Sequence, residues 1–332
     1  MALTQHPAPA AGPRLDEEEH IALRDRSSRD KFEALVRRLS EQSVLKHYDA
    51  YADIPWDEPE FAVDQDDPRW ELPEADPLGS SDWYRNQPAG VRSRIGLYRY
   101  ASAAKLGGEF ENVLKRGLLE HAFRLENHDP TFRYIYHEVV EEAHHGMMFQ
   151  EFVNRSGLPI DGMPKHLRAG ANSVVLMGRV FPELFFIFVL GGEDPIDYVQ
   201  REILRREREL PPVIETMMRH HVTEEARHLS FARHYLKQEV PKLGFIRRTI
   251  MSIAAPIILG IMAQMMLKAP AGVAREFHVP DDVMRASYHR NPQIAESTRD
   301  GVKKVRKLCR EIGLLNPVST VLWRVLGIYA KD

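Results

Sequence analysis

Two helical segments of this chain each carry the pattern Glu-x-x-His, and this repetition constrains the fold more than any other feature. The segments read EEAHHGMMF at 141–149 and EEARHLSF at 224–231. Residues three apart on a helix share a face, so a carboxylate and an imidazole can reach one point. Two such helices, with a single glutamate from each of two further helices, form the recurrent dinuclear metal site of four-helix bundles. The pattern predicts an all-α, ferritin-like four-helix bundle with additional flanking helices.

Helical periodicity dominates the remaining sequence, and no composition break indicates a second domain. We expect a disordered tail over 1–28 and then one all-helical domain over 29–332, made of a helix and wrapping segment (29–90), the metal-binding bundle (92–240) and flanking helices (246–330). The expected helices span 29–50, 92–125, 130–155, 170–191, 195–209, 211–238, 246–268, 280–288, 294–312 and 317–329. The sequence GGEDP at 191–195 should separate two of them. The wrapping segment should cover the core through Trp56, Trp70 and Trp83.

The first motif contains two overlapping Glu-x-x-His pairs, and their helical faces distinguish them. Glu142 and His145 share a face with apolar side chains. Glu141 and His144 share theirs with Glu151, which indicates solvent. Because buried ligands belong on the apolar face, we predict Glu142 and His145 as metal ligands.

The second motif adds a third imidazole. Glu225 and His228 lie among apolar neighbours, with Glu224 as the alternative carboxylate. His221 stands four residues before Glu225 and seven before His228, so all three side chains lie along one stripe, and we predict that all three bind metal. Arg227 should face a carboxylate of a neighbouring helix, either to support the ligands or as an ordinary ion pair between helices.

The two remaining helices must each supply a glutamate. On 92–125 the apolar stripe selects Glu111, with Glu109 as the alternative. On 170–191 Glu183 lies in an apolar stripe, where a carboxylate is costly unless a cation compensates it. The rivals Glu193, in a glycine-rich turn, and Glu202, near arginines, are expected to be exposed.

The predicted ligand set balances the charge of two divalent ions. It consists of Glu111, Glu142, Glu183, Glu225, His145, His221 and His228. Four carboxylates neutralise four positive charges, and mixed oxygen and nitrogen ligands suit iron or manganese. We expect two iron ions, with a manganese–iron pair as the alternative, and O2 as the co-substrate. Glu138 is expected to be a further acid near the metals or a partner behind the ligands.

Composition limits which electron donors, partners and cell compartments are expected. The single cysteine, Cys309, excludes an iron–sulfur centre within one chain, so electrons should come from an external donor. A net charge of −3 argues against nucleic acid. No signal-peptide pattern opens the chain, which favours the cytoplasm. The uncharged stretch 249–267 is long enough to span a bilayer, but we favour a buried bundle helix over membrane contact.

Four short segments resemble the AurF-like para-aminobenzoate N-oxygenase family of diiron oxygenases. They are ENVL at 111–114, EEAHH at 141–145, ELFF at 183–186 and HVTEEARH at 221–228. The resemblance covers 92–240, and the third histidine, His221, is its most discriminating element. It implies a diiron monooxygenase that oxidises an aromatic amine stepwise toward a nitro compound, with electrons from an external reductase or ferredoxin.

Two features depart from that family and leave the substrate open. The stretch GGEDPIDYVQREILRRER, between Glu183 and Pro211, is longer than the family's connection, and both FFIFVL and the Met-rich 250–267 helix are more apolar. The substrate is therefore either an amine or a more apolar small organic molecule. The alternatives are a diiron acyl-chain desaturase or hydroxylase and, from another class, an iron-binding, iron-storage or structural helical protein. A homodimer is compatible with this kind of bundle.

Overall fold

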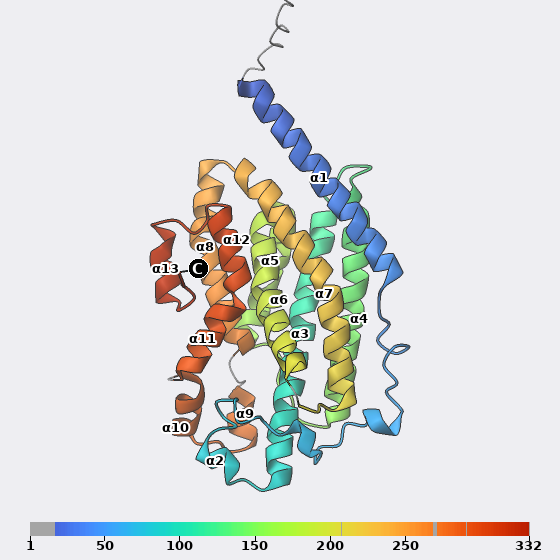
Figure 1. Ribbon diagram of the computed structural model, residues 1–332, viewed down its shortest axis with the longest axis vertical. Coiled ribbons are helices and arrows are strands. Elements are labelled where there is room, and N and C mark those ends of the chain that lie inside the picture. The colour runs from blue at the N-terminus through green and yellow to red at the C-terminus, as the bar shows by residue number, and fades with distance from the viewer. Residues whose placement is uncertain (1–16, 207, 268–270, 290, 332) are drawn as a thin grey trace, which may run out of the picture.

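The computed structural model describes residues 17–206, 208–267, 271–289 and 291–331, and this part of the chain is helical without a β-strand (Figure 1). The central helices are α3 (Ala89–Ala122), α4 (Pro130–Ser156), α6 (Pro182–Arg205) and α7 (Pro212–Glu239). Helices α3 and α7 each pack against both α4 and α6, which closes a four-helix bundle. The predicted all-α bundle with flanking helices is confirmed.

The other elements surround this bundle. The larger ones are α1 (Glu17–Leu45) against α4 and α7, α5 (Lys165–Val180) against α3 and α6, and α8 (Phe245–Leu267) against α6. The shorter ones are η1 (Pro59–Phe61), η2 (Pro68–Trp70), α2 (Asp82–Arg85), η3 (Val240–Lys242), α9 (Ala271–Glu276), α10 (Asp281–Met284), the π-turn η4 (Arg285–His289), α11 (Pro292–Gly301), α12 (Lys303–Glu311) and α13 (Ser319–Val325). In Figure 1, α1 crosses the bundle obliquely and its first half extends past one end.

The ends of the bundle helices follow from local sequence. Before α4, the Asp129 carboxylate accepts a hydrogen bond from the Thr131 N–H, and Pro130 occupies the first helical position, where its missing N–H costs nothing. After α4, Gly157 adopts a left-handed φ of 64°, which a residue without a side chain tolerates. The residues that flank α4, which carries the first Glu-x-x-His motif, thus define both of its ends.

The break between α5 and α6 lies at Phe181–Pro182 and not, as predicted, at 191–195. Pro182 cannot continue the hydrogen-bond ladder of α5 but fits the first turn of α6. The glycines that suggested a turn instead allow close packing. A β-carbon on Gly192 would lie 2.2 Å from the ring of Phe110 on α3. Helix α6 therefore continues through this sequence and brings different side chains into the bundle.

The two ends of the chain also differ from expectation. Helix α1 begins at Glu17, so the expected tail was wrong for residues 17–28, while its residues 1–16 lie outside the described residues. The expected helix over 294–312 is two helices, α11 and α12, which meet at Val302. The wrapping segment buries Trp56 and Trp70, whereas Trp83 is half-buried.

Helix α8 is half-buried, whereas the sequence predicted a wholly buried helix. By length and composition alone it could cross a membrane. One side buries Met251 and Leu259 in the core, while four isoleucines on the other side are 39–47% exposed: Ile250, Ile253, Ile257 and Ile261.

Candidate metal centre

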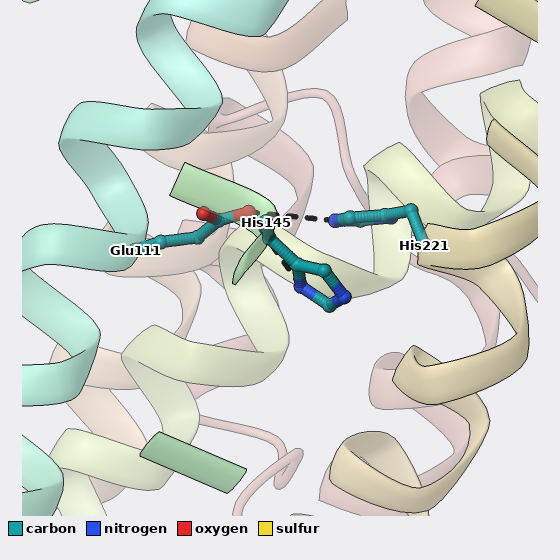
Figure 2. Close-up of side chains that lie close together, drawn as sticks. All are labelled: Glu111, His145 and His221. Atoms are coloured by element: carbon teal, nitrogen blue, oxygen red, sulfur yellow. Dashed lines mark ion pairs between the residues drawn. The ribbon is translucent and has the colours of Figure 1, made fainter. Parts of the chain in front are cut away.

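Six of the seven predicted ligands converge in the middle of the bundle. They come from three helices: Glu111 from α3, Glu142 and His145 from α4, and His221, Glu225 and His228 from α7. Each is at most 1% exposed. Figure 2 shows Glu111 and His221 facing each other across the bundle, with His145 beside them.

The reactive atoms of this cluster lie within a few ångströms of one another. His221 Nε2 is 3.5 Å from Glu111 Oε1 and 3.8 Å from Glu225 Oε1. On the opposite side, His228 Nδ1 is 3.0 Å from Glu142 Oε1 and 3.1 Å from Glu225 Oε1. The remaining distances, from His145 Nδ1, are 3.5 Å to Glu142 Oε2, 3.7 Å to Glu225 Oε1 and 4.0 Å to Glu111 Oε1. Glu142 thus lies near two imidazoles and Glu225 near all three.

The structure does not bring Glu183 to this cluster; Glu193 takes that place. Because α6 begins at Pro182, Glu183 lies in its first turn, about 15 Å along the helix from Glu193. The Glu183 carboxylate lies 3.9 Å from the Arg247 guanidinium, which compensates its charge. Glu193 is 3% exposed, against the prediction of an exposed residue, and reaches His221 and Glu225. Treating 182–205 as one helix would have revealed Glu193 on a stripe with buried Phe186 and Leu190.

The other rivals lie outside the cluster. Glu109 faces away from the bundle centre and pairs with Arg168 at 2.8 Å. Glu202 is half-buried and pairs with Arg205 at 2.7 Å. Of the two carboxylates considered on α3, only Glu111 points into the centre.

The first glutamate of each Glu-Glu pair lies within hydrogen-bond distance of the metal-facing histidine of the other motif. Glu141 Oε2 lies 2.7 Å from His228 Nε2, and Glu224 Oε2 lies 2.8 Å from His145 Nε2. The doublets are therefore not alternatives, because each helix supplies one inner and one outer carboxylate. The prediction that Glu141 faces solvent was wrong, since it is 3% exposed. Such outer partners fix the tautomer and orientation of metal-binding imidazoles.

Further groups contact the two outer carboxylates and the third imidazole, and together with Glu141 and Glu224 they form the outer layer of the centre. Arg227 donates to Glu141 at 2.8 Å and lies 3.6 Å from Glu224, so one guanidinium joins the two outer carboxylates. The backbone N–H of Tyr48, from the segment after α1, donates to Glu224 at 2.9 Å. On α6, Gln200 Oε1 lies 2.9 Å from His221 Nδ1. Sequence reasoning placed Arg227 against a neighbouring carboxylate but missed Tyr48 and Gln200, whose roles depend on tertiary contacts.

Apart from His228 Nδ1 and Glu225 Oε1, which lie 3.1 Å from each other, several inward-facing atoms lack hydrogen-bond partners. They include His145 Nδ1, Glu111 Oε2, Glu225 Oε2 and both carboxylate oxygens of Glu142. Buried polar atoms are rarely left unpaired, and each unpaired one is costly. Orphaned atoms directed at one point, with every imidazole held from behind, fit a set of metal ligands.

Burial disfavours the charged form of two carboxylates of the centre, Glu111 and Glu193. Burial raises the pKa of Glu111 well above its ordinary value, and the neighbouring Glu142 carboxylate raises it further. Burial and the Glu225 carboxylate raise the pKa of Glu193 in the same way. Cations in the centre would remove this penalty by replacing the protons, so metal binding should release protons.

The pKa values of two imidazoles shift in opposite directions because their neighbours differ. Burial, with help from the nearby His145, lowers the pKa of His221 well below its ordinary value, which leaves a neutral, coordinating ring. Burial also disfavours charge on His145, but the carboxylates of Glu142 and Glu224 outweigh it and raise the pKa of that imidazole. A cation between these groups would displace that proton from Nδ1, while Nε2 keeps its bond to Glu224.

A cavity of about 490 Å³ lies beside the centre, between α3, α4 and α5. Gly146 lines it and also touches the centre, because a β-carbon there would lie 3.7 Å from Glu111 Oε2 and 3.2 Å from Lys115 Nζ. The lining mixes polar and apolar side chains and carries a basic excess, with Lys105, Arg116 and Arg168 against a single acid, Glu109.

Four helices around a buried centre of carboxylates and imidazoles define a ferritin-like protein of the diiron carboxylate class. The chain belongs to the family described as P-aminobenzoate N-oxygenase AurF, which it matches over residues 29–313. The resemblance carried by the four motifs is thereby confirmed. Residues 191–205 of the stretch after Glu183 continue α6.

The relatives of the chain do not define a substrate. It is 40% identical over 297 residues to an uncharacterized protein of Mycobacterium bovis (Mb0909) and to one of Mycobacterium tuberculosis (Rv0885). The overlap covers 90% of this chain and 87% of each relative. No solved structure matches the chain significantly.

Proposed function

We propose that this protein is a diiron oxygenase that oxidises the nitrogen of a small organic amine, with electrons from an external reductase or ferredoxin. One observation carries the proposal: inward-facing ligand atoms without partners converge from three helices and Glu193 approaches from the fourth, while the outward atoms of the imidazoles are held by hydrogen bonds. Family membership supports this kind of chemistry.

Seven side chains would hold the two ions. They are Glu111, Glu142, Glu193 and Glu225 with His145, His221 and His228. Their four carboxylates balance the four positive charges of a diferrous pair, and the mixture of oxygen and nitrogen atoms suits iron. Glu193 replaces Glu183 of the predicted set for the geometric reasons given above.

The bound irons would supply the redox chemistry that activates O2. In the first oxidation, one oxygen atom would enter the amine to give a hydroxylamine, and the other would leave as water. This step consumes two electrons from the donor and two protons. The chain itself contributes a dry site, since the Phe149 ring packs 5.3 Å from the His221 ring and shields the centre.

The cavity favours an amine that also carries an acidic group. Arg168 is paired with Glu109, whereas Arg116 donates to the neutral Asn172 at 2.7 Å and has no acidic partner in the described part of the chain. Its charge is therefore available to an anion. An arylamine with a carboxylate could place that group at Arg116 and extend its amine toward Gly146.

The apolar sequence that suggested a fatty substrate has a structural role instead. Phe185, Phe186 and Ile187 are wholly buried in the core, and none of them lines the cavity. We therefore favour the amine over the acyl-chain reading.

The test is a turnover assay with iron-loaded protein, a chemical or enzymatic reductant and ¹⁸O2. We expect ¹⁸O in the hydroxylamine formed from a carboxylate-bearing arylamine, with weaker turnover of aniline and none of a fatty acyl substrate. Arg116→Gln should raise KM for the carboxylate-bearing amine and leave KM for aniline unchanged. Oxidation of the acyl chain alone, or no labelled product from any amine, would overturn the proposal.

A further inference from the structure

Glu138 is a buried carboxylate that the seven-ligand set leaves unexplained. It lies on α4 one turn before Glu142, on the same face of the helix, and is 1% exposed. One ligand atom each from Glu138, Glu142 and His228 lies within 4.8 Å of the others. Its Oε2 atom has no hydrogen-bond partner. Glu138 thus shares the two properties that distinguish the inner ligands: it is directed at the centre and it is orphaned.

Glu138 forms no ion pair with a lysine or arginine of the described residues. Other buried acids do: Glu141 with Arg227 and Asp194 with Arg233. The imidazole that Glu138 approaches is His228, itself one of the seven proposed ligands. Burial disfavours the charged form of a carboxylate in this position, so a role only in stabilising the fold does not account for it.

We propose that Glu138 is an eighth metal ligand, bound to the ion that His228 holds. This inference rests on the proposed dinuclear site and adds to it. The geometry places Glu138 with one imidazole and one shared carboxylate, a set that an octahedral ion can accept together with Glu225. At the opposite position Glu193 approaches His221 and Glu225, so each end of the cluster has a carboxylate of its own.

The additional carboxylate has a consequence for the oxidation state. With Glu138 the centre carries five negative charges, one more than two divalent ions balance. Oxidation of one iron to the trivalent state supplies the missing charge. Glu138 should therefore stabilise the oxidised centre more than the diferrous one, and its loss should raise the midpoint potential.

The test compares Glu138→Gln, which removes the charge at nearly constant shape, with Glu183→Gln, which removes a buried carboxylate at the far end of α6. Iron stoichiometry, affinity by chelator competition, ⁵⁷Fe Mössbauer spectra and the midpoint potential are measured for each. In Glu138→Gln we expect one of two quadrupole doublets to shift, one site to weaken by at least about tenfold, and the potential to rise. Glu183→Gln should match the wild type in all of them.

A second variant keeps the proposal testable if glutamine disturbs the fold. Glu138→Leu removes a buried polar group with an unpartnered oxygen, so the metal-free protein should unfold at a higher temperature while the same doublet still shifts. Two unchanged doublets and an unchanged potential in a folded variant would overturn the role of Glu138. Wild-type protein that binds no iron would instead overturn the dinuclear site itself.

Discussion

Replacing Arg227 by methionine tests the outer layer of the centre, because this guanidinium joins Glu141 and Glu224 and is itself 6% exposed. The variant keeps the length of the side chain but leaves both carboxylates without their cation. Glu141 retains His228 at 2.7 Å, and Glu224 retains His145 and the Tyr48 N–H, so the loss amounts to one buried ion pair. We expect the free energy of unfolding of the metal-free protein to fall by about 3–5 kcal/mol.

The same substitution should loosen the metal, because His145 and His228 lose part of their orientation. Affinity for Fe(II), measured by chelator competition, should drop by about 10- to 100-fold. The control is Arg219→Met, which breaks an exposed pair with Glu215 on α7 and should cost about 0–1 kcal/mol with unchanged iron affinity. Urea denaturation followed by circular dichroism measures both variants. If Arg227→Met kept wild-type stability and wild-type affinity, the proposed role of the outer layer would be refuted.

Three further predictions concern the inner ligands and the cavity. Glu193→Ala should lose iron from one position while Glu183→Ala keeps both ions, as an iron count by atomic absorption would show; equal iron content in the two variants would contradict the assignment. Burial raises the pKa of Glu138 to about 8 from an ordinary 4.5, so the folded protein binds a proton that the unfolded chain has released in this range. The metal-free protein should therefore lose stability as pH rises from about 5 to 8, and Fe(II) should flatten the thermal-unfolding profile; a flat profile without metal would exclude the effect. Gly146→Val should hinder access from the cavity to the centre, and so raise KM or lower kcat at unchanged iron content. Wild-type kinetics in this variant would show that the cavity is not the route to the centre.

Sequence periodicity was sufficient where a ligand and its supporting face lie on one helix. The spacing of His221, Glu225 and His228 placed all three on one stripe, and the structure brings them together. The same reasoning separated Glu111 from Glu109, because only Glu111 shares a face with apolar side chains.

Periodicity failed where the answer depends on contacts between helices. The sequence at 191–195 has the composition of a turn and therefore predicts an exposed Glu193. In the structure Gly192 instead allows close packing against Phe110, and the helix continues. The partners of Glu141 and Glu224 could not be predicted from helical faces either. Each of these glutamates contacts an imidazole of the other helix. Helical faces identify which side chains are buried, but they do not show which partner each one meets.

The most direct test of the dinuclear centre is anomalous diffraction at the iron edge from crystals of the iron-loaded protein, combined with an iron count. We predict two iron atoms per chain in the middle of the bundle, one near His145 and the other near His228, with Glu142 and Glu225 between them. A chain that binds no iron, or binds it only at surface histidines, would contradict the central claim.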